Sequence, residues 1–176
     1  MQPQTFNAAA LDPYAERITT GVALLGGVLM LPALFSLLSG IRAGAVIVAV
    51  GVAAALAAFL LLSYAFQPTR YDLTADALIV RRRLARRLSV PYKEILGVSE
   101  AAAMADLPRV GLRRSFNAGV FGYAGPFQLA PYGRVFLVAT NREKMVAVAR
   151  VAGPPLLLSP ARPKPFVEAA REALTR

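Results

Sequence analysis

Five arginines crowd into one short stretch of the chain and are the side chains best suited to bind another molecule. They are Arg81, Arg82, Arg83, Arg86 and Arg87. Guanidinium groups pair well with phosphate, and anionic headgroups attract basic side chains that lie close to a membrane. The stretch therefore predicts contact with anionic lipid headgroups; the alternative is a turn that is merely solvated. Nucleic acid is a disfavoured partner, because no recognition motif is interleaved with the arginines.

A run rich in glycine and aromatic residues is the second candidate site. Its members are Arg114, Phe116, Gly119, Phe121, Gly122, Tyr123 and Gly125. Glycines at three-residue spacing permit positive φ angles or close backbone approach, and the rings would bury much apolar area. One interpretation is a loop folded onto the open edge of a β-sandwich. The other is a surface of exposed aromatic rings that recognises a membrane interface or a peptide. The glycines lack the strand-to-helix context of a phosphate-binding loop.

Catalytic chemistry has few candidates in this chain. Its 176 residues include neither His nor Cys, which excludes the usual zinc sites, Ser-His-Asp triads and Cys-His pairs. No close acidic cluster suggests a metal, and no nucleotide-binding or hydrolase motif is present. We therefore expect a non-enzymatic protein with no catalytic residues, no metal and no cofactor.

Two apolar stretches precede the arginines and must position them. Residues 18–39 and 43–66 would form helices of roughly 33 Å and slightly more, which matches the roughly 30 Å of a bilayer's hydrocarbon. Only a short break containing Arg42 separates them. This pattern predicts a transmembrane helical hairpin with residues 1–17 and 67–176 on the same side of the membrane.

The distribution of charge indicates which side that is. The formal net charge is +10, and within the first 66 residues two arginines balance two acidic residues, so the whole excess follows residue 66. Lys and Arg accumulate on the cytoplasmic side of membrane proteins. We therefore predict a multi-pass protein of the cell membrane with both termini in the cytoplasm. Residues 1–17 are polar and are expected to be poorly ordered.

Small residues mark one face of the second apolar stretch. Ala45, Ala49, Ala53 and Ala57 recur every four residues, a spacing that lets helix backbones approach closely in lipid. The face is predicted to pack inside the hairpin, with a homodimer contact as the alternative. Pro32 is expected to kink the first helix. A cleaved signal peptide is the alternative for the first stretch, but a signal's apolar core is shorter and follows a more basic segment.

The rest of the chain reads as short strands followed by a helix. Alternating apolar residues and turn signals predict about seven strands, at residues 71–74, 78–82, 86–90, 95–100, 133–140, 145–151 and 156–158. From Pro163 the apolar period changes to that of a helix, with Phe166, Ala170 and Leu174 on one face. Four strands, three strands and a capping helix is the order of a pleckstrin-homology (PH) domain. The predicted fold class is a membrane-anchored α+β protein: a transmembrane hairpin, then a PH-like β-sandwich closed by a C-terminal helix.

Local motifs strengthen that assignment. A Tyr-x-Leu-Thr strand at 71–74, a Val-Pro-Tyr-x-x-Ile segment at 90–95, the glycine-rich run at 114–127 and a Ser-Pro pair at 159–160 resemble a family of bacterial membrane proteins with a PH-like domain. This chain departs from the family's pattern at Ala118, where a glycine is expected. The resemblance implies the fold and the two-helix topology, and it assigns no activity and no catalytic residue.

These observations lead to one functional expectation and one alternative. The first is a membrane protein whose cytoplasmic PH-like domain binds anionic lipid headgroups or a protein partner at the membrane surface. The alternative is a structural or assembly subunit that self-associates through the PH-like domain and the transmembrane hairpin.

Overall fold

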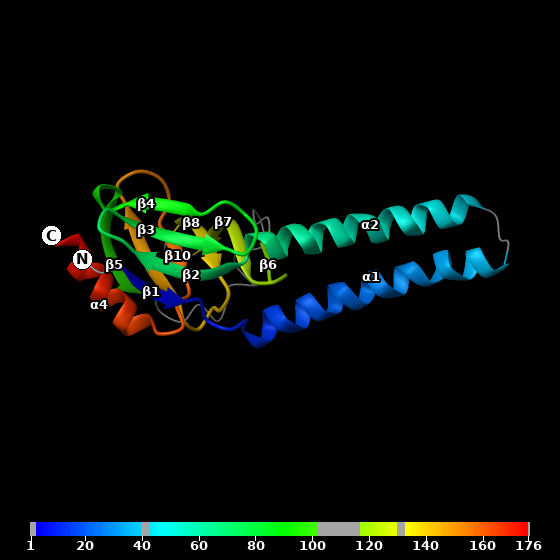
Figure 1. The fold of residues 1–176 in the computed structure, drawn as a ribbon, viewed down its shortest axis with the longest axis horizontal. Coiled ribbons are helices and arrows are strands. Elements are labelled where there is room, and N and C mark those ends of the chain that lie inside the picture. Colours follow the sequence, from blue (N-terminus) through cyan, green and yellow to red (C-terminus); the bar gives the residue numbers. More distant parts are fainter. Residues whose placement is uncertain (1–2, 40–42, 102–116, 130–132, 176) are drawn as a thin grey trace.

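A helical hairpin and a β-rich domain make up the protein. The computed structural model describes residues 3–39, 43–101, 117–129 and 133–175. Helices α1 (Pro13–Ser39) and α2 (Ala43–Phe66) run side by side from one end of the domain, and both chain termini lie at the other end (Figure 1).

Both helices are long and apolar enough to cross a membrane, by length and composition alone. Large apolar side chains such as Leu24, Phe35 and Ile47 are more than half exposed along them. Of the predicted alanine face, Ala53 and Ala57 line the groove between the helices; Ala53 is buried and Ala57 exposed, and Ala49 is half-buried. The side chains of Pro32 and Ala45 lie outside the described part of the structure.

The domain contains ten strands among the described residues, where the sequence analysis predicted about seven. The first sheet has the order β1-β2-β3-β4 and the second the order β5-β9-β10-β8-β7-β6, antiparallel throughout except for the β8–β10 pair. The strands are β1 (Gln4–Asn7), β2 (Pro68–Leu73), β3 (Ala77–Arg82), β4 (Leu88–Pro91), β5 (Ile95–Glu100), β6 (Asn117–Ala118), β7 (Tyr123–Leu129), β8 (Gly133–Ala139), β9 (Val146–Arg150) and β10 (Leu156–Leu158). The three strands that were not predicted are β1, β6 and β7.

The prediction that residues 1–17 are poorly ordered was wrong for the described part of this segment. Strand β1 pairs antiparallel with β2 along its whole length, and beyond it Ala9 N donates to Ser159 O at 2.8 Å. This strand is ordered because the edge of β2 satisfies its backbone hydrogen bonds and because Phe6, its one apolar residue, packs against the core. The same segment continues into α1, which begins at Pro13 rather than at residue 18.

The loop interpretation of the glycine-rich run was wrong from Tyr123 onward, whereas residues 119–122 do form a turn, between β6 and β7. Tyr123, Gly125, Phe127 and Leu129 are buried and the residues between them are not, which is the period of two of a strand with one covered face. These residues form β7, inside the six-stranded sheet. Arg114 and Phe116 lie outside the described residues.

The C-terminal helix α4 (Pro163–Leu174) closes the domain as predicted. Phe166 is fully buried and Ala170 nearly so, both within the core cluster that the two sheets share, and Leu174 packs against that cluster. Phe166 meets Phe6 of β1 and Tyr71 of β2 edge-on, at centroid distances of 5.3 and 5.9 Å.

Tyr71 gives the core a measurable pH response. Its buried hydroxyl donates to Val138 O and accepts from Ser159 N, both at 3.1 Å, and burial raises its pKa from 10.0 to about 12. The unfolded phenol ionises first, so this group's stabilisation is complete below pH 10 and is lost as the pH rises to about 12. The free energy of unfolding should fall by about 1.4 kcal/mol per pH unit in that window on account of Tyr71.

Other groups titrate there too, so the measured quantity is the difference between wild type and Y71F in chemical denaturation at several pH values. The two curves should converge as the pH rises from 10 to 12. Parallel curves would show that the Tyr71 hydroxyl does not titrate with unfolding.

Candidate functional site at the base of the hairpin

The arginine turn, residues 83–87 between β3 and β4, folds against the end of α2. Leu84 N and Ala85 N both donate to Ala65 O, at 3.2 and 3.0 Å, and Arg83 N donates to Gln67 O at 3.0 Å. The last carbonyls of a helix have no partner within the helix and carry partial negative charge, so a basic turn is well placed there. The turn between β3 and β4 therefore lies at the end of α2.

The five arginines do not form one surface, because their side chains go to different partners. Arg81 pairs with Asp72 across β2 and β3, which neutralises its charge. Arg83 lies over the Tyr64 ring at 4.7 Å and donates to the Gln67 side chain at 2.7 Å. Arg86 and Arg87 are exposed, and among the described residues neither makes a side-chain hydrogen bond or ion pair.

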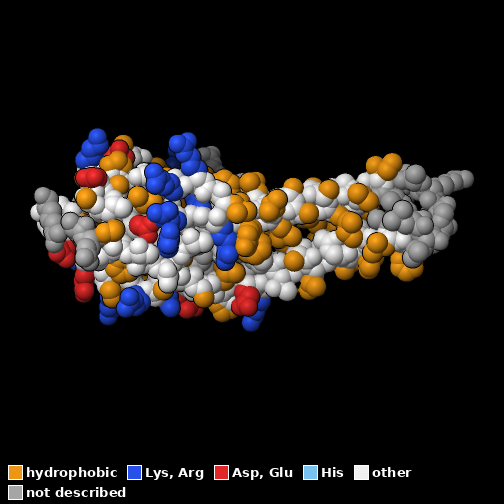
Figure 2. Space-filling view, viewed as in Figure 1, with side chains coloured by type: hydrophobic (Ala, Val, Ile, Leu, Met, Phe, Trp, Pro, Cys, Tyr) orange, Lys and Arg blue, Asp and Glu red, His pale blue; other side chains and the backbone are white. Residues whose placement is uncertain are grey.

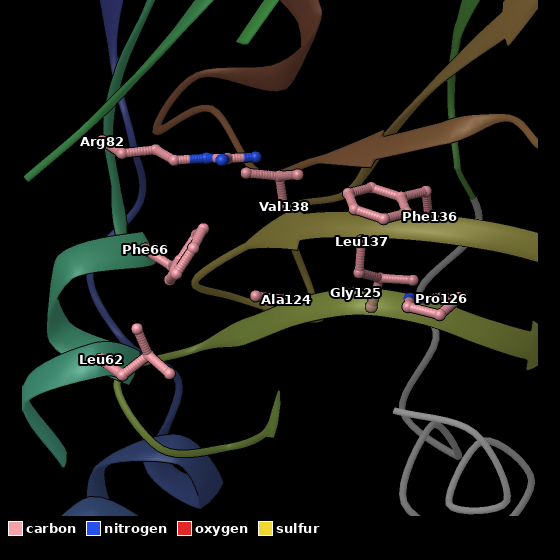
Figure 3. Close-up of a pocket in the computed structure, with 9 residues that line it drawn as sticks. All are labelled: Leu62, Phe66, Arg82, Ala124, Gly125, Pro126, Phe136, Leu137 and Val138. Atoms are coloured by element: carbon pink, nitrogen blue, oxygen red, sulfur yellow. The ribbon is translucent and has the colours of Figure 1, made fainter. Parts of the chain in front are cut away.

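Arg82 points instead toward an apolar groove of about 450 Å³. Its guanidinium lies 5.3 Å from the centre of the Phe66 ring, and among the described residues its buried Nε has no hydrogen-bond acceptor. Burial lowers the pKa of Arg82 from its usual value. Figure 3 shows this side chain extending from β3 across the groove toward Val138. The lining consists of Leu62, Phe66, Arg82, Ala124, Gly125, Pro126, Phe136, Leu137 and Val138.

The glycine-rich turn at 119–122 lies against both helices. Phe121 N donates to Thr19 Oγ1 of α1 at 2.8 Å, and the Phe121 ring meets Tyr64 of α2 edge-on at 5.2 Å. Gly122 has φ +118°, and a Cβ there would lie 2.6 Å from Ala139 O, so only glycine fits. Gly119, Gly122, Tyr123 and Gly125 are buried and Phe121 is half-buried, so this part of the run joins the domain to the hairpin.

Asp12 completes this junction and was missed by sequence reasoning. The carboxylate is 1% exposed and caps α1 by accepting from Ala15 N at 2.8 Å. It also accepts from the Tyr123 hydroxyl at 3.0 Å and from the backbone N and Nε of Arg142 at 3.0 and 3.1 Å. Burial, and then the Asp12 charge, raise the pKa of Tyr123. The Asp12-Pro13 pair before an apolar run is a helix-start signal that would have revealed the cap.

The charge distribution divides the molecule in two. Figure 2 shows apolar side chains along the hairpin, and Lys and Arg on the domain and at the base of the helices. Among the described residues, no group of three or more acidic side chains is placed to hold a metal ion.

Comparison with known proteins identifies the domain. The sequence model of a family described as Bacterial PH domain matches residues 69–174, which run from β2 to α4. No curated protein and no solved structure matches the chain. The N-terminal strand and the two helices lie outside the matched range.

Proposed function

Because the chain belongs to the bacterial PH domain family, we propose that it is a non-enzymatic, membrane-anchored binding protein. The helical hairpin anchors the PH-like domain at the cytoplasmic face of the cell membrane, and the domain binds anionic lipid headgroups or a protein partner there. The observation that carries this proposal is the contact between the arginine turn and the last turn of an apolar helix.

The height of the turn relative to the bilayer follows from that contact. If α2 spans the hydrocarbon, its last residues lie at the interface, and a turn hydrogen-bonded to Ala65 lies among the headgroups. Arg86 and Arg87 are then free to meet them. Juxtamembrane basic residues contribute about 1 kcal/mol each near an anionic surface. The concentration of basic residues after residue 66 supports a cytoplasmic domain.

Self-association is the second candidate. The groove between α1 and α2 leaves small residues accessible for a second hairpin, among them Gly27, Ala54 and Ala57. In this alternative the protein purified in mild detergent is a dimer by light scattering.

One cysteine variant serves two experiments, of which the first tests on which side of the membrane the domain lies. The chain has no cysteine, so S89C places a unique thiol at an exposed position of β4, close to the arginine turn. A membrane-impermeant maleimide should label S89C only after spheroplasts are opened. Labelling of intact spheroplasts would contradict the cytoplasmic placement.

An environment-sensitive fluorophore on the same thiol reports headgroup contact in reconstituted vesicles. Adding phosphatidylglycerol to phosphatidylcholine should shift its emission to the blue, and R86Q/R87Q should remove up to about 2 kcal/mol of that preference. The effect should shrink as added salt shortens the Debye length from about 10 Å toward 3 Å. The matched control is K93Q/K164Q, which removes two exposed charges on η1 (Tyr92–Glu94) and α4. Equal losses in both double variants would show that only net charge matters.

A further inference from the structure

We propose that the groove beneath α2 binds one acyl chain of an anionic membrane lipid, whose headgroup pairs with Arg82. The groove is the one described above, between the last turn of α2 and strands β7 and β8 (Figure 3). This inference rests on the proposed membrane anchoring and adds to it a bound lipid at a defined position.

The walls of the groove fit a hydrocarbon chain. Leu62 and Phe66 form one side, and Pro126, Phe136 and Val138 contribute to the other. The volume of about 450 Å³ is within the range of small-molecule sites. Among the described residues the lining side chains are apolar apart from Arg82, so the groove offers little to a peptide, whose backbone groups need hydrogen-bond partners. An acyl chain has no such groups, and the apolar lining keeps it out of water as the bilayer does.

Arg82 supplies the charge that selects the headgroup. Arg82 is half-buried, and a guanidinium partly removed from water is costly unless an anion pairs with it. Its neighbour Arg81 already has the Asp72 carboxylate, whereas no acidic side chain in the described structure forms an ion pair with Arg82. The phosphate of a lipid headgroup would meet the guanidinium at the mouth of the groove and supply the anion that this charge lacks.

The position of the groove favours a lipid over a soluble amphiphile. Leu61 and Leu62, in the last turns of α2, are 62% and 43% exposed, and Leu62 also lines the groove. An acyl chain could therefore pass from the bilayer along α2 into the groove without crossing water.

Tryptophan quenching tests the inference on the full chain. The protein has no tryptophan, so F136W places a unique fluorophore in the groove, and F35W places one on the exposed face of α1. Each variant is reconstituted in nanodiscs of phosphatidylcholine containing a minor fraction of acyl-brominated phosphatidylglycerol, or of brominated phosphatidylcholine. Bromine quenches tryptophan only on contact.

We expect F136W to be quenched more by brominated phosphatidylglycerol than by brominated phosphatidylcholine, and F35W to be quenched equally by both. Adding R82Q should reduce the preference at F136W about fivefold, whereas R82K should keep most of it and R86Q/R87Q should change it little. If R82Q does not fold, F136W alone still tests the inference. Stronger quenching by brominated phosphatidylglycerol than by brominated phosphatidylcholine supports the inference, and equal quenching contradicts it.

Three outcomes would overturn the inference. Equal quenching of F136W by both lipids would remove the role of the headgroup, and relief of its quenching by inorganic phosphate would indicate a site for the anion alone. Unquenched F136W beside quenched F35W would show an anchored protein with an empty groove. Unquenched F35W would instead refute the membrane anchoring itself, which separates the failure of the proposed function from that of the groove.

Discussion

Replacing Asp12 with alanine is expected to destabilise the full-length protein by about 3–5 kcal/mol. The change removes the cap of α1 and leaves the Arg142 guanidinium and the Tyr123 hydroxyl facing each other in a nearly closed space without their acceptor. Removing one partner of a buried ion pair costs more than the pair itself contributes, because an uncompensated charge stays behind. Chemical denaturation in mild detergent, followed by the near-ultraviolet circular dichroism of the tyrosines, measures the loss.

Two further variants make this experiment specific. D12N keeps one acceptor oxygen and should lose less than D12A. E16Q removes a carboxylate from the same first turn of α1, but Glu16 is exposed, so its effect should stay within about 0.5 kcal/mol. A loss below about 1 kcal/mol in D12A would show that Asp12 does not couple the helix to the domain.

Truncating Phe166 to alanine is the second change with a large expected effect, a loss of about 3–5 kcal/mol. Phe166 is fully buried, and its edge-on contacts with Phe6 and Tyr71 join three elements: α4, β1 and β2. The cavity left behind would lie where the helix closes the two sheets. The same denaturation assay measures the loss in the full chain, which must include β1 because Phe6 belongs to it.

F166L is the matched variant, since it keeps most of the volume and loses only the ring contacts. We expect its loss to be well below that of F166A. Should F166A cost less than about 1 kcal/mol, α4 would not share a cooperative core with the sheets, and its closing role would be wrong.

The junction explains why these residues bear on function as well as stability. Asp12 fixes the start of α1, the arginine turn fixes the end of α2, and the glycine-rich turn at 119–122 contacts both helices. The PH-like domain is thus tied to the hairpin at several separate points. In the proposed membrane anchoring, these ties would fix which face of the domain meets the bilayer, namely the face at the base of the helices that carries the arginine turn and the groove.

Local patterns were enough to predict the two apolar helices, the closing helix α4 and seven of the ten strands in the described part of the chain. Each of these elements shows a pattern among residues close together in the sequence. The two helices are long uninterrupted apolar runs, and the strands alternate apolar and polar residues. In α4 the residues Phe166, Ala170 and Leu174 fall on one helical face.

Only the tertiary structure decided the rest. Strand β1 is polar and is ordered by the edge of β2, which lies more than 60 residues away in the chain. Asp12 acquires its partners from β7 and from the turn after β8, and no spacing along the sequence relates these positions. The five arginines look equivalent in the sequence, yet Asp72, Tyr64, the groove and solvent give them different environments. Pairing, burial and charge compensation depend on groups brought together from distant parts of the chain, so they exist only once the fold has formed.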